Sequence, residues 1–92
     1  MSGVALHVGG YKNISATGNV APIASKMVGI FVASASSTPT ITVYDSATTT
    51  TSDPVTGTFT PTAGTWYSIP CATEYGIYVV IGGTVNATVV FA

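Results

Sequence analysis

The stretch Gly76–Phe91, with the sequence GIYVVIGGTVNATVVF, constrains the fold more than any other part of the chain. In residues 84–91 apolar and polar side chains alternate, which predicts a half-buried strand. In residues 77–81 both faces are apolar, so that strand must lie centrally in a sandwich or against another subunit. Gly82-Gly83 can take the positive φ values of a tight turn. The sequence therefore predicts a hairpin of two strands.

The remainder of the chain repeats the strand pattern and offers no helix. Strands are expected at residues 4–8, 11–16, 26–33, 40–45, 55–60 and 65–69, with a bent segment at 19–24 and strand ends at Gly and Pro. No apolar stripe with helical spacing lasts two turns. We therefore expect an all-β fold in a single domain, residues 1–92: a small antiparallel β-sandwich or jelly-roll-like barrel of about seven to nine short strands, without helix.

Residues 45–54, DSATTTTSDP, are the one low-complexity segment. Their Thr and Ser side chains favour turns and have nothing apolar to bury beyond Ala47. We interpret the segment as a protruding Thr/Ser-rich loop with a turn-initiating Asp near each end.

The charge content is very low and limits the possible partners. Charged residues make up 5% of the chain and the net charge is −1, whereas typical soluble domains carry about 25% charged residues. A neutral, hydroxyl-rich surface predicts association with other subunits. Lys12 and Lys26 are the only cations, so neither nucleic acid nor an anionic membrane is expected as a partner.

The residues with chemical potential do not form a catalytic pattern. His7 has no Cys, Asp or Glu at metal-ligand spacing. Cys71 lacks an adjacent base, and Asp45, Asp53 and Glu74 do not have the pattern of a calcium loop or a glycosidase pair. We expect no catalytic residue, no metal, no cofactor and no enzymatic activity.

The apolar and aromatic residues on outward faces are the candidate contact residues. In residues 27–33 and 77–81 the second face is apolar, and such patches mark interfaces unless a closed barrel or covering loops bury them. The candidate interface residues are Met27, Phe31, Tyr67, Tyr78 and Val80. We expect self-association with cyclic symmetry. Aromatic residues such as Trp66 also permit a carbohydrate platform, although core packing is the commoner role.

Three motifs carry a resemblance to a known class of proteins. Tyr44-Asp45 ends a strand, Pro61–Pro70 (PTAGTWYSIP) forms a turn and strand, and Gly76–Thr84 (GIYVVIGGT) opens the last predicted hairpin. Together they resemble small structural proteins of tailed bacteriophages, over residue 41 to the end of the chain. The resemblance implies a virion β-sandwich or jelly-roll protein, such as a capsid decoration (cement) protein. Such proteins commonly form trimers on the capsid surface.

The sequence and the resemblance together lead to one expected function and one alternative. We expect a non-enzymatic virion structural protein, a decoration protein that forms a homo-oligomer, a homotrimer by the resemblance, and binds the major capsid protein. Its expected location is the virion, assembled in the host cytoplasm. The alternative is a carbohydrate- or receptor-binding module of a phage tail or fibre.

Overall fold

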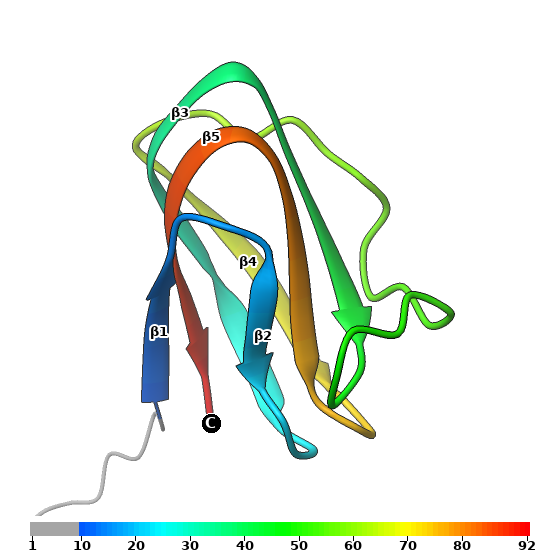
Figure 1. Cartoon of the computed structure of the whole chain (residues 1–92). Helices are drawn as coiled ribbons and strands as arrows, with labels where there is room; N and C mark the ends of the chain where they lie inside the picture. The colour runs from blue at the N-terminus through cyan, green and yellow to red at the C-terminus, as the bar shows by residue number, and fades with distance from the viewer. Residues whose placement is uncertain (1–9) are drawn as a thin grey trace, which may run out of the picture.

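Two long strands that pair with each other along their whole lengths form the centre of the fold (Figure 1). The computed structural model describes residues 10–92. The strands are β1 (Gly10–Ile14), β2 (Gly18–Ala21), β3 (Lys26–Asp45), β4 (Thr65–Ala72) and β5 (Ile77–Phe91). They form one antiparallel sheet in the order β1-β5-β3-β4, and β2 also pairs with β5. Within residues 10–92 there is no helix, which confirms the expected all-β class.

Both β3 and β5 bend halfway, so that each strand contributes to two facing halves of the sheet (Figure 1). The register between them shifts at this point, between Ser36 and Thr40, and also between Val32 and Ser34 and beside Met27. The first half contains residues 26–36 of β3 and 84–91 of β5, together with β1 and β4. The second half contains residues 40–45 and 77–82, together with β2.

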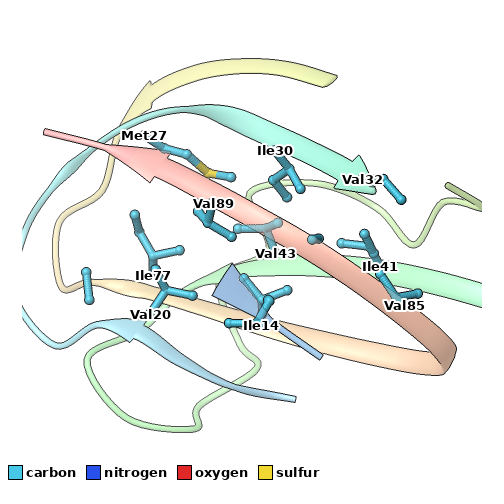
Figure 2. Packing of buried hydrophobic residues seen from close by; sticks show 13 residues of the cluster. Ile14, Val20, Met27, Ile30, Val32, Ile41, Val43, Ile77, Val85 and Val89 are labelled. Carbon is cyan, nitrogen blue, oxygen red and sulfur yellow. The ribbon is translucent and has the colours of Figure 1, made fainter. Parts of the chain in front are cut away.

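The core lies between the two halves, where alternate residues of both long strands meet (Figure 2). The largest fully buried side chains are Ile30, Val32, Ile41, Val43, Ile77, Val79, Val85 and Val89. They follow the period of two that the sequence shows in each strand. Each such side chain stabilises the fold by about 1.5–3 kcal/mol relative to an exposed one, before conformational entropy is subtracted.

The bend has an unusual backbone that explains the Gly-Gly pair. Gly83 has φ 70°, and Ser37 and Thr38 across from it have φ 59° and 54°. A Cβ at position 83 would lie 2.5 Å from Ser37 O and 2.8 Å from Thr38 O. Only glycine allows the two strands to approach this closely and adopt the left-handed conformation without strain. Gly82 and Gly83 therefore allow the paired strands β3 and β5 to bend at the same place.

The predicted hairpin across Gly82-Gly83 is therefore wrong, and so is the number of strands. Residues 10–92 contain five strands. Two predicted pairs, 26–33 with 40–45 and 77–81 with 84–91, are each one continuous bent strand. The predicted strand at 55–60 makes one isolated bridge, between Phe59 and Ile41. All five strands belong to one hydrogen-bonded sheet, so a sandwich of two sheets or a closed barrel stays a prediction. The predicted strand at 4–8, with His7, lies outside the described residues.

A β-bulge changes the predicted face of Met27. Between Met27 and Gly29 the partner on β5 moves by only one residue, from Phe91 to Val90, so β3 has one extra residue relative to β5 and its alternation changes phase. On the other side the partner on β4 moves by three residues, from Cys71 to Ser68, so β4 has an extra residue of its own there. Met27 therefore points into the core instead of outward, and only 2% of it is exposed. The sequence also predicts that the strand beginning at residue 65 ends before Pro70. In the structure β4 continues through Pro70 to Ala72. An edge strand with a bulge is where a sheet tolerates proline.

The Thr/Ser-rich loop follows β3, as the sequence suggests, but its ends are anchored. Asp45 is the last residue of β3, and its N–H donates to Asp53 O at 2.8 Å. Pro54 makes a bridge to Tyr44. Ser46 is buried, and its Oγ accepts hydrogen bonds from Thr48 N and Thr50 N. The protruding part of the loop is therefore confined to the residues between these anchors.

We predict that Gly83→Ala lowers the free energy of unfolding by about 2–4 kcal/mol, since it adds both left-handed strain and a clash. Two glycines provide matched controls. Gly64 also has positive φ, 75°, but nothing lies within 4 Å of its Cβ position, so Gly64→Ala should cost about 1 kcal/mol from strain alone. Gly57 has neither feature, and Gly57→Ala should be within about 0.5 kcal/mol of wild type. Urea unfolding of the three variants measures this order, and equal effects would refute the shared bend.

Candidate functional site

The carboxylate of Asp45 connects the end of β3 to the segment that precedes β5. Its two oxygens accept hydrogen bonds from the backbone N–H groups of Glu74 at 2.8 Å, Tyr75 at 2.8 Å and Gly76 at 3.3 Å. Burial raises the pKa of Asp45, but these backbone donors together outweigh it, so the pKa lies below its usual value. Asp45 is thus a clamp between the end of β3 and the connector before β5.

Among residues 10–92, Cys71 and the carboxylates are the other groups with reactive potential. Within residues 10–92 no three His, Cys, Asp or Glu side chains form a group able to hold a metal ion. Burial, and to a lesser degree the charge of Asp45, raises the pKa of the Cys71 thiol. This shift keeps Cys71 protonated and opposes a nucleophilic role.

A hollow of about 390 Å³ lies at the Thr/Ser-rich loop, between Asp45, Asp53 and Tyr75. Two of its polar side chains are engaged in local hydrogen bonds, the Asp45 carboxylate in the clamp and Ser46 Oγ within the loop. The hollow is shaped by the anchoring of the loop, and it offers Tyr75, 54% exposed, as its one large aromatic side chain.

The side of the first half that faces away from the core forms a second surface, here called the outer face. Strand register places four residues of four neighbouring strands in one row across it: Asn13 of β1, Thr88 of β5, Phe31 of β3 and Trp66 of β4. Neighbouring strands lie about 4.8 Å apart, so the row spans roughly 14 Å. Phe31 is 42% and Trp66 45% exposed.

The indole of Trp66 leans across β3 onto Gly29. A Cβ at position 29 would lie 2.6 Å from Trp66 Cζ2 and 2.8 Å from Cη2, so the ring occupies the space that any other residue would fill. A glycine in a strand often marks such a close approach. The ring is supported from below by the sheet, while almost half of the side chain remains open to solvent.

At the polar end of the row, the side chains of Asn13, Asn86 and Thr88 are hydrogen-bonded to one another. The side-chain amide of Asn13 donates to Asn86 Oδ1 at 3.0 Å and to Thr88 Oγ1 at 3.1 Å. It also donates to the backbone oxygen of Ala87 at 3.2 Å. These contacts tie the edge strand β1 to β5 and hold three polar side chains in fixed positions beside Phe31.

The side between β4 and the segment after the loop is a third surface, here called the open side. β4 ends the strand order, so within residues 10–92 no strand pairs with its second edge. Next to this edge a hollow of about 200 Å³ is lined by Thr56, Phe59, Tyr67, Ser68 and Ile69. The ring centroids of Phe59 and Tyr67, two of these lining residues, lie 5.1 Å apart. Apolar side chains here are only partly covered by the core.

The structure distributes the five candidate interface residues over different environments. Met27 and Tyr78 are buried within the chain. The Tyr78 ring lies 6.2 Å from that of Tyr44. Tyr78 also pairs with Asn19, whose amide binds the loop carbonyls of Ser46 and Thr48. The sequence predicts an exposed apolar face that includes Tyr78, but the structure buries this residue.

Three of the five candidates remain accessible. Phe31 is exposed on the outer face, Tyr67 is half-buried at the open side, and Val80 is half-buried on the second half of the sheet. Whether they contact a partner stays a prediction.

Sequence reasoning missed the alignment of Asn13 with Thr88 and of Phe31 with Trp66. The alternation in residues 84–91 does assign Asn86 and Thr88 to a common polar face. Nothing in the sequence indicates that β1 pairs with this stretch, or that Trp66 lies opposite Phe31. These neighbours depend on strand order and register.

Comparisons with protein-family models, with curated proteins and with solved structures find no match to this chain. In the part of the chain that the structure describes, no helix has the length and apolar character of a membrane span.

We predict that Asp45→Asn lowers the free energy of unfolding at neutral pH by about 1–2 kcal/mol, because hydrogen bonds to a charged acceptor are stronger than those to an amide. The lowered pKa means that the carboxylate stabilises the folded state above its unfolded pKa and loses this effect as the pH falls through its folded pKa. The difference between variant and wild type should therefore shrink below about pH 4.

Asp53→Asn is the matched control for this prediction, because Asp53 contributes a backbone oxygen, and not its carboxylate, to the contact with Asp45. Urea unfolding between neutral and acid pH measures both variants. A stability difference for Asp45→Asn that does not change with pH would contradict the role of its charge.

Proposed function

We propose that this chain is a non-enzymatic structural protein of a virion, a capsid decoration protein that self-associates and binds the capsid surface. The observation that carries the proposal is the open side, where the free edge of β4 lies over an apolar hollow. A free strand edge offers unpaired N–H and C=O groups to another chain. Partly covered apolar side chains beside it, such as Phe59 and Ile69, gain burial when that chain binds.

The charge distribution supports self-association over binding to an ionic partner. Within the described residues the lining of the hollow at the open side has no charged side chain. Contacts there must be apolar or hydroxyl-mediated, and a second copy of the same neutral chain provides matching chemistry. Such contacts depend little on ionic strength, because salt screens charges and leaves apolar burial intact.

The bent sheet also supports the finer fold proposal of a small sandwich or jelly-roll-like unit. The two halves face each other across one core, and Val55 and Phe59 donate backbone hydrogen bonds to the edge of β3 in the second half. The resemblance to phage structural proteins adds the expectation of a trimer, of the major capsid protein as partner and of the virion as location. Closed cyclic assemblies are the usual outcome when one interface repeats.

We predict that the protein associates at micromolar concentration in both low and high salt, as measured by light scattering. Ile69→Lys places a charge in the hollow at the open side and should weaken association by roughly tenfold or more. Ser36→Lys adds the same charge at the exposed bend, away from that hollow, and should associate like wild type. Circular dichroism shows whether both variants keep the sheet.

A monomeric wild-type protein in both salts would refute self-association. The capsid part of the proposal has a separate test. Purified particles of the virus that encodes this chain should contain it in many copies, and mass spectrometry of the particles measures this. Particles that lack the protein would exclude a role in the virion.

A further inference from the structure

We propose that the outer face binds a neutral saccharide along the row of Trp66, Phe31, Thr88 and Asn13. The alternative function of a carbohydrate-binding module thus gains a defined site, on a surface different from the open side. The inference does not depend on the proposed self-association.

The aromatic half of the row provides an apolar platform for sugar rings. Phe31 and Trp66 are directly opposite each other on β3 and β4, and both are partly open to solvent. The C–H face of a pyranose ring packs on an aromatic ring in the same way as other apolar surfaces do. Trp66 is held in place by its contact with Gly29, so little conformational freedom is lost when a ligand binds.

The polar half of the row has hydrogen-bonding groups left for a ligand. Asn13 uses its amide N–H groups within the protein, and Asn86 and Thr88 use acceptor oxygens. Within residues 10–92 no protein group donates to Asn13 Oδ1 or accepts a hydrogen bond from Asn86 Nδ2. The hydroxyl of Thr88 likewise keeps its proton for another acceptor. Sugar hydroxyls both donate and accept, so they match this set.

The mixture of groups favours a saccharide over a purely apolar partner. An apolar surface that covered the row would leave the free groups of Asn13, Asn86 and Thr88 without partners, and buried unpaired polar groups are costly. A ligand with an apolar ring face and a hydroxyl edge satisfies both halves at once. Ligand sites commonly combine such an apolar floor with a few placed polar groups.

The absence of charge indicates a neutral ligand. The neighbouring row of the outer face contains Tyr11, Val90, Gly29 and Ser68, and neither row has a charged residue. Lys12 pairs with the buried Val89, so it belongs to the opposite side of β1, and its ammonium donates to Asn19 O at 3.1 Å. An anionic glycan would therefore find no cation within either row.

The single tryptophan of the chain makes the test direct, because all indole fluorescence comes from Trp66. The probes are neutral oligosaccharides (maltohexaose, cellohexaose and chitohexaose), with heparin as an anionic comparison. We expect at least one neutral probe to change the Trp66 emission in a saturable way at up to millimolar concentration, and heparin to have no effect. Isothermal titration calorimetry then measures the affinity.

Three variants locate the site. Trp66→Ala should weaken binding by roughly tenfold or more. Asn13→Ala, which keeps the reporter, should weaken it by roughly threefold to tenfold. Tyr75→Ala removes an exposed aromatic side chain outside the row and should bind like wild type. Circular dichroism checks that each variant is folded. If Trp66→Ala does not fold, Asn13→Ala still tests the site.

The proposal is overturned if no neutral probe binds, if heparin binds as well as they do, or if Asn13→Ala and Tyr75→Ala both bind like wild type. Light scattering of Trp66→Ala gives a further outcome: if this variant is monomeric while wild type associates, a second copy covers the outer face and the saccharide assignment is wrong. Because self-association is assigned to Ile69 and the open side, failure of one proposal leaves the other separately measurable.

Discussion

The close approach of β5 to β3 at the bend is the contact on which the rest of the structure depends. Gly83 lies against the backbone oxygens of Ser37 and Thr38, at distances that leave no room for a side chain. Because both long strands turn at the same level, their hydrogen bonds resume on the other side of the bend. A small chain can thereby cover its own core with one continuous sheet, and the strain of two non-glycine residues in the left-handed region is offset by burial of the core.

The bend also determines which surfaces remain free. Folding the sheet over places the inner residues of both halves together and leaves the outer face of the first half uncovered, with Phe31 and Trp66 exposed. At one side the halves are not joined by strand pairing, and this produces the open side beneath the edge of β4. On the second half the outcome is different, since Tyr78 is buried next to the anchored loop. The bend of one sheet therefore leaves two distinct surfaces accessible in the described part of the chain.

Two charged side chains and one buried serine connect separate segments of the fold. Asp45 clamps the connector before β5, Lys12 links β1 to β2, and Ser46 shapes the loop. A chain with so few charges cannot attract a partner over long distances. Recognition must then depend on short-range contacts of apolar surface, amide and hydroxyl groups, which are the groups found at the outer face and the open side.

The sequence by itself determined the strand class, the buried face of most strand segments and the lack of a catalytic pattern. Alternation with a period of two is a local property, so Val85, Val89 and Ile41 could be assigned to the core without knowledge of their partners.

Three features depended on tertiary structure. A Gly-Gly pair permits a turn and a shared bend equally, so only pairing over the full length of β3 showed that the predicted hairpin is one strand. The bulge beside Met27 changes the face of that residue through the register with β5, which no local pattern records. The row from Asn13 to Trp66 joins residues from four strands, and their alignment follows from strand order and register, which only the folded sheet decides.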